Sequence, residues 1–189
     1  MDLTLFYFVH GFAGLSAWGD ALIVFFAETY LYVVLLVFVF AALRAYMRTR
    51  QMFSIINYGI ALAAAIVARL GVTEVIRHFY HNDRPYTAIA GLSHLINDTA
   101  SSFPSGHTIF IFALAAAAHF FNKKLAYFLY ASGVMIGIAR VAAGVHYPSD
   151  IAGGIVLGAL TGVIVYILAR KVIYSLNLPR HTQPELHQQ

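Results

Sequence analysis

Residues 140–150 read RVAAGVHYPSD and stand between two long apolar segments. Arg140 opens the stretch, His146 follows six residues later, and Asp150 follows after four more. Only 11% of the chain is charged, and ionisable groups beside a membrane segment are costly enough that they usually have a function. We therefore interpret this stretch as half of a candidate active site, held between two membrane helices.

The composition is typical of a membrane protein. Sixty per cent of the 189 residues are hydrophobic, and the mean hydropathy is +0.74, whereas soluble domains are about 45–50% apolar and about 25% charged. The length suits one domain. We predict a single membrane-embedded domain over residues 1–178 and a polar tail over 179–189. The absence of cysteine excludes disulfides, a thiol nucleophile and a thiolate metal site.

Apolar segments long enough for helices recur along the whole chain, so we predict an all-α, polytopic membrane helical bundle. A crossing of about 30 Å takes about 20 residues. About five segments fit, at 20–43, 53–76, 105–121, 125–140 and 150–168. Residues 3–18 are broken by Gly11 and Gly14 and are expected to form an interfacial helix or a short sixth helix. Glycines spaced by four in the last two segments predict close helix contacts.

Basic residues gather on one side of this predicted bundle. That side receives Arg44, Arg48, Arg50, Lys123, Lys124, Arg170, Lys171 and Arg180, whereas the other receives only Arg77, Arg84 and Arg140. The positive-inside rule makes loops 44–51 and 122–124 and the tail cytoplasmic. The net charge of +4 then reflects cytoplasmic loops, and no nucleic-acid partner is expected. The first residues lack the basic region of a cleavable signal peptide.

A second polar cluster, RHFYHNDRP, spans residues 77–85 at the end of the second segment. Arg77 and Arg84 are seven residues apart, and Pro85 stops a preceding helix. Such arginines suit anion binding, and arginines that touch lipid headgroups are an equal alternative. The other polar residues within and after this cluster, Asn82 and Asp98 among them, are interpreted mostly as solvated loop, with one or two as candidates to contact a second phosphate.

A third cluster, SFPSGHT, spans residues 102–108 where the third apolar segment begins. Pro104 ends any preceding helix, and Ser105 is a favoured N-cap residue. Gly106 would allow a ligand to approach the backbone, and the free N–H groups of a helix N-terminus can bind phosphate. His107 would lie in the first turn of that helix.

The opening stretch supplies chemistry that fits the other two clusters. Arg140 can bind phosphate through two N–H groups. His146 can attack phosphorus if a carboxylate holds its other ring nitrogen, and Asp150 is four residues away. A helix-capping aspartate beside an interfacial histidine is the alternative.

Together the three clusters resemble the type-2 phosphatidic acid phosphatase superfamily, whose pattern is Lys-x6-Arg-Pro, Pro-Ser-Gly-His and Ser-Arg-x5-His-x3-Asp. This chain has Arg77-x6-Arg84-Pro85, Pro104-Ser105-Gly106-His107 and Ala139-Arg140-x5-His146-x3-Asp150. Two positions depart from the pattern. Arg77 replaces a lysine, which changes a point charge into a fork, and Ala139 replaces a serine that could donate a hydrogen bond.

The resemblance implies a role for each residue. His146 would be the nucleophile, Asp150 its orienting partner and His107 the general acid and base. Arg77, Arg84, Arg140, Ser105 and Gly106 would bind the phosphoryl group, and catalysis would need neither a metal nor another cofactor. Glu74 and Pro104 are further candidates for contacting substrate or orienting other residues. Glu74 could orient Arg77 or contact substrate, and a structural pair with Arg69 is the alternative.

The N-terminal pattern narrows the expected substrate. Residues 11–14, 16–20 and 25–28 (GFAG, SAWGD and FFAE) resemble the small bacterial undecaprenyl-diphosphatase branch, which acts on the outer side of the inner membrane. Phosphatidylglycerophosphate, phosphatidate and lipid A phosphatases share the three motifs and remain alternatives. A vanadium haloperoxidase would be soluble. A non-catalytic lipid-binding or transport protein would not need both histidines and Asp150. The oligomeric state has no signature in the sequence.

Overall fold

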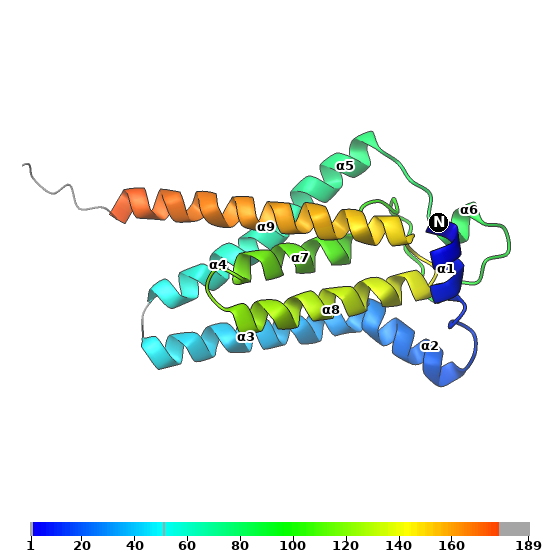
Figure 1. Ribbon diagram of the computed structural model, residues 1–189, viewed down its shortest axis with the longest axis horizontal. Coiled ribbons are helices and arrows are strands. Elements are labelled where there is room, and N and C mark those ends of the chain that lie inside the picture. The colour runs from blue at the N-terminus through cyan, green and yellow to red at the C-terminus, as the bar shows by residue number, and fades with distance from the viewer. Residues whose placement is uncertain (1, 51, 178–189) are drawn as a thin grey trace, which may run out of the picture.

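The computed structural model describes residues 2–50 and 52–177, and every regular element within those ranges is helical. The predicted all-α class is therefore confirmed, while the predicted tail at 179–189 lies outside the described residues. Figure 1 shows long helices packed side by side, with short helices at one end. The helices are α1 (Asp2–His10), α2 (Ala17–Val24), η1 (Phe25–Thr29), α3 (Tyr30–Thr49), α4 (Met52–Ile66), η2 (Val67–Val72), α5 (Thr73–Phe79), α6 (Pro85–Ala88), α7 (Gly106–Ala118), α8 (Lys123–Ala142) and α9 (Pro148–Asn177), where η1 and η2 are π-helical.

Four helical runs are long and apolar enough to cross a membrane: Ala17–Thr49, Ser54–Phe79, Lys123–Ala142 and Pro148–Ile173. Each of the first two is continuous through a π-helical turn. The segment predicted at 105–121 is shorter than expected, because α7 has only 13 residues and rises about 20 Å. The bundle thus has four candidate spans and one short apolar helix in its described residues.

The short helix α7 is the centre of the bundle. Eleven of its residues are buried, and Figure 1 shows it enclosed between α4, α8 and α9. The predicted glycine stripe of α9 packs against it: a Cβ at Gly158 would lie 2.4 Å from the Ile109 carbonyl oxygen, and one at Gly162 would lie 2.3 Å from that of Ala113. Only glycine permits this approach, which fixes the start of α7 beside the start of α9.

The N-terminal helix α1 lies across the end of the bundle instead of along it (Figure 1). Asp2 accepts hydrogen bonds from the backbone N–H of Ser149 at 3.1 Å and from its hydroxyl at 2.7 Å. Phe6 is fully buried, with its ring 5.7 Å from that of Tyr147. His10 bonds the Ala142 carbonyl at 2.8 Å. These contacts fasten α1 to both ends of the loop between α8 and α9.

Candidate active site

The loop from α8 to α9 buries His146 and Asp150 together. Gly144 turns the chain with φ of 80°, a conformation that favours glycine. His146 Nδ1 lies 3.5 Å from Asp150 Oδ2, which also accepts the backbone N–H of Tyr147 at 2.8 Å. Asp150 therefore caps α9 and faces the histidine at the same time. Because His146 is 1% exposed, the alternative of an interfacial histidine is wrong.

Asp150 and Ser102 both lie near Nδ1 of His146, and Nε2 of the same ring faces the guanidinium of Arg84. Ser102 Oγ lies 3.4 Å from Nδ1 and donates a short hydrogen bond to Asp150 Oδ2. On the far side of the ring, Nε2 lies 3.4 Å from Nη1 of Arg84. Burial, followed by the charges of Arg140 and Arg84, lowers the pKa of His146 well below its usual value. A neutral ring with Nε2 directed at a guanidinium is suited to attack on a bound anion.

A loop carboxylate joins two of the predicted phosphate-binding arginines. Asp98 Oδ2 lies 2.8 Å from Arg84 Nη2 and 2.9 Å from Arg140 Nη2. Burial alone would raise the pKa of Asp98, but the two guanidinium charges outweigh it and lower that pKa. Arg84 is anchored further by the carbonyls of Ala100 at 2.7 Å and Val145 at 2.8 Å. Asp98 is therefore an exception among the polar residues that we interpreted mostly as solvated loop.

The start of α7 brings the second cluster to the same place. Ser105 occupies the predicted N-cap position, although its hydroxyl accepts from Thr108 at 3.1 Å and makes no cap hydrogen bond. Its backbone N–H donates to the Asp150 carbonyl at 3.2 Å. His107 follows Gly106 in the first turn, close enough to Arg140 and His146 to interact electrostatically with both. The two histidines therefore share one polar centre.

Arg77 approaches this centre from α5. Its Nη2 donates to the Pro104 carbonyl at 3.2 Å, and its Nη1 lies 3.8 Å from Glu74 Oε1. The same Glu74 oxygen accepts from Arg69 Nη1 at 2.7 Å. Glu74 therefore forms the pair with Arg69 and also faces Arg77, so both sequence interpretations describe part of its environment.

Two arginines of the predicted motifs each retain an unused donor. Among the described residues, Arg77 Nε and Arg140 Nε are buried and have no hydrogen-bond partner, whereas the buried Nη2 of Arg84 pairs with Asp98. Buried donors without acceptors are costly. The three arginines come from separate segments, and all three are close enough to His146 to interact with it electrostatically. An anion with several oxygens, such as a phosphoryl group, would satisfy them together.

Sequence reasoning missed three polar residues of this centre: Asp98, Ser102 and Asn82, whose Nδ2 lies 3.5 Å from Asp150 Oδ1. All three belong to the segment between the first two motifs or to the motif edges. The one available signal was their occurrence in the longest polar region of an apolar chain. No spacing rule assigns partners within an irregular loop.

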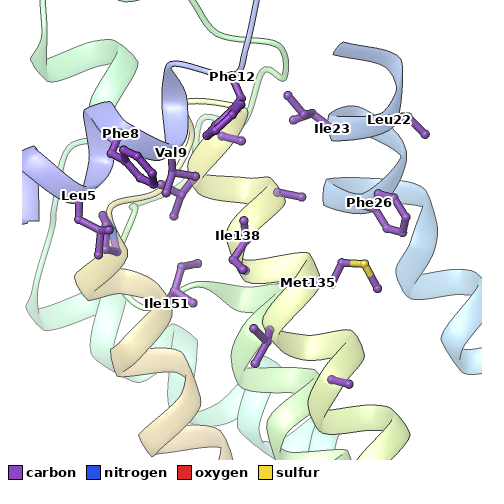
Figure 2. A pocket seen from close by; sticks show the side chains of 17 residues that line it. Leu5, Phe8, Val9, Phe12, Leu22, Ile23, Phe26, Met135, Ile138 and Ile151 are labelled. Carbon is purple, nitrogen blue, oxygen red and sulfur yellow. The ribbon is translucent and has the colours of Figure 1, made fainter. Parts of the chain in front are cut away.

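A separate, apolar cavity of about 880 Å³ is lined mainly by residues of α1, α2 and α8. Figure 2 shows Leu5, Phe8 and Val9 of α1, and Phe12 of the turn that follows it, facing Met135 and Ile138 of α8 across the cavity, with Ile23 and Phe26 nearby. None of the predicted catalytic or phosphate-binding residues lines it. The cavity is suited to a hydrocarbon chain, because all of its lining residues are apolar.

Comparison with known proteins relates the chain to membrane phosphatases. The family model described as PAP2 superfamily matches residues 54–174. "Bacitracin transport permease protein BcrC" of Bacillus licheniformis is 27% identical over 92% of this chain and 83% of its own length. "Undecaprenyl-diphosphatase BcrC" of Bacillus subtilis is 26% identical over 88% and 83%, respectively. The crystal structure of Aquifex aeolicus LpxE has a TM-score of 0.67 and 25% identity, covering 87% of this chain and 93% of that one.

Proposed function

This chain belongs to the PAP2 superfamily of membrane lipid phosphatases, and we propose that it hydrolyses the terminal phosphate of undecaprenyl or another polyprenyl diphosphate. One observation carries the proposal: the charges of Arg77, Arg84 and Arg140 all act on a buried histidine, and Arg77 and Arg140 each keep a buried Nε donor without a partner. That arrangement suits a phosphoryl group whose charge increases in the transition state.

In the first step His146 Nε2 attacks the terminal phosphorus. A P–N bond forms, the P–O bond to the lipid monophosphate breaks, and His107 gives its proton to the departing oxygen. The neutral ring that attacks through Nε2 carries its proton on Nδ1, where Asp150 and Ser102 hold it, so the positive charge that develops on the ring is stabilised. Burial and the charge of Arg140 disfavour a protonated His107 in the free protein. The negative charge of bound substrate offsets those effects.

In the second step water attacks the phosphohistidine. His107, now neutral, accepts a proton from the water, the P–N bond breaks, and inorganic phosphate leaves. The arginines, Ser105 and the Gly106 N–H hold the phosphoryl oxygens throughout. Because the cations of this site are guanidinium groups, we expect phosphate release to continue in a metal chelator.

Two observations support a polyprenyl diphosphate as the substrate. The N-terminal residue pattern resembles the undecaprenyl-diphosphatase branch, and a relative over most of the chain bears that activity in its name. Phosphatidylglycerophosphate, phosphatidate and lipid A remain alternative substrates on the same motifs. Another relative is named a transport permease, but a buried His–Asp pair with Arg84 at Nε2 favours catalysis over transport.

The distribution of basic residues supports a location for the site. We propose a bacterial inner-membrane protein whose loops 44–51 and 122–124 and C-terminal tail are cytoplasmic, with the active site on the periplasmic side. In Figure 1 the α3–α4 and α7–α8 connections lie at one end of the bundle, and α1 and α6 lie at the other.

Phosphate release from purified protein tests the proposed activity. Polyprenyl diphosphate, phosphatidate and phosphatidylglycerophosphate are compared as substrates for the unaltered protein and for His146→Ala. We expect the diphosphate to react with the highest kcat/KM and the variant to be inactive on all three. Equal release by both proteins would overturn the mechanism, and a preference for another lipid would overturn the substrate.

A further inference from the structure

A fourth arginine, Arg69, stands at the active site without a role in the steps above. It lies in η2, a π-helical turn within the run from α4 to α5. Both the backbone N–H and the hydroxyl of Thr73 bond the Ala68 carbonyl, the latter at 3.0 Å. Such π-helical turns occur frequently at functional sites. This one lies where the helical run passes the start of α7.

The side chain of Arg69 lies directly on the backbone at Gly106. A Cβ built on Gly106 would be 2.6 Å from Arg69 Nε and 3.1 Å from its Cζ. The guanidinium therefore occupies the space in which any other residue would carry its side chain. His107, the next residue, is near enough to interact electrostatically with Arg69. Arg69 is thus the neighbour of the proposed general acid.

Arg69 is more exposed than the other arginines of the site. The side chain is 36% exposed, against 9% for Arg77 and 1% for Arg140. Glu74 holds one Nη1 donor at 2.7 Å, and an arginine has five N–H donors. Arg69 therefore presents a fixed, partly open cation at the edge of the site, on the side of His107.

The covalent structure of a diphosphate places its second phosphate on the same side of the site as Arg69. His107 must reach the oxygen that links the two phosphorus atoms, because that oxygen receives the proton. The second phosphate is attached to this same oxygen, so it must lie on the His107 side of the terminal phosphate. A phosphate monoester has only carbon at that position.

We propose that Arg69 binds the second, lipid-linked phosphate and makes the site selective for diphosphates over monophosphates. This inference rests on the proposed diphosphatase function and gives that function a second phosphate subsite. Glu74 is a positioning residue, since its carboxylate holds the guanidinium against Gly106. Charge-assisted hydrogen bonds between a guanidinium and a phosphate account for the expected selectivity.

The test compares two substrates that share one prenyl chain. Values of kcat/KM are measured for a polyprenyl diphosphate and the matching monophosphate with the unaltered protein, Arg69→Gln and Lys124→Gln. Lys124 is an exposed residue near the start of α8 and serves as the charge-matched control. We expect Arg69→Gln to lose about 10–100-fold on the diphosphate and less than about twofold on the monophosphate. An equal loss on both, or no loss, would overturn the proposal.

A second measurement remains informative if the natural lipid is not a diphosphate. Methylenediphosphonate and inorganic phosphate are compared as competitive inhibitors against whichever lipid phosphate the protein cleaves best. Arg69→Gln should weaken the diphosphonate about tenfold and leave phosphate unchanged, and Arg69→Lys should recover part of the difference. Parallel weakening of both inhibitors counts against the subsite. A failure of the diphosphatase function alone appears instead as poor diphosphate turnover by the unaltered protein.

Discussion

Asp98 Oδ2 lies 2.9 Å from Arg140 Nη2, so a loop carboxylate neutralises a guanidinium that is 1% exposed at the end of α8. Asp98 also contacts Arg84, which connects two arginines from different segments. A buried charge without a partner is strongly destabilising. The loop between α6 and α7 is therefore part of the proposed phosphate-binding centre.

Replacement of Asp98 by asparagine should misplace both arginines. We expect Asp98→Asn to lower kcat/KM about 100-fold, the usual cost of displacing catalytic groups by about 1 Å. Phosphate release measured below the unfolding temperature gives the comparison. Asp83→Asn is the matched control, because Asp83 is largely exposed and faces His81. Equal activities of the two variants would show that Asp98 does not position the site.

Ser102 is expected to assist catalysis through His146. Removing its hydroxyl in Ser102→Ala takes away a partner of Asp150 and of Nδ1. Loss of one such hydrogen bond should lower kcat about tenfold. Ser132→Ala removes a buried serine that bonds Tyr30 at 3.1 Å within the bundle. That control should lose stability but keep its turnover, and a similar fall in turnover for both would contradict the role of Ser102.

The depressed pKa of His146 predicts that activity persists at acid pH while stability falls. The ring stays neutral in the folded protein below about pH 6.5, where a histidine in the unfolded chain becomes protonated. The unfolded state therefore binds more protons, and this contribution to stability is lost as pH falls from about 6.5 toward the folded pKa. Activity should show no loss with an apparent pKa near 6.5. A pH profile of kcat/KM, paired with thermal unfolding, checks both statements.

The packing of Phe6 should stabilise the loop between α8 and α9, which carries His146. Its fully buried ring contacts Tyr147, and Phe→Ala replacements in cores cost about 3–5 kcal/mol. We expect Phe6→Ala to lower the unfolding temperature and to reduce activity together. Phe8 lies on the same helix and is 69% exposed, so Phe8→Ala should change little. If the two variants unfold alike, α1 does not support the loop.

Motif spacing predicted which residues would meet, since Arg84, Arg140, His146 and Asp150 do lie together. It could not predict Asp98 or Ser102, because an irregular loop has no periodicity from which partners can be inferred. The length of α7 was overestimated for a related reason. Phe120 and Phe121 are apolar and continue the hydropathy signal past Ala118, but the chain turns there before Lys123. An apolar segment can be buried either inside the helix bundle or in lipid, and hydropathy does not distinguish the two environments.

The orientation of the site can be tested because the chain contains no cysteine. His81→Cys introduces a single thiol on an exposed position between α5 and α6, and Lys124→Cys introduces one at the other end of the bundle. With the active site periplasmic, a membrane-impermeant maleimide should label His81→Cys in intact cells and label Lys124→Cys only after the membrane is opened. The reverse pattern would place the phosphate-binding centre in the cytoplasm. Such a result would contradict the assignment based on basic residues and exclude a substrate confined to the outer leaflet.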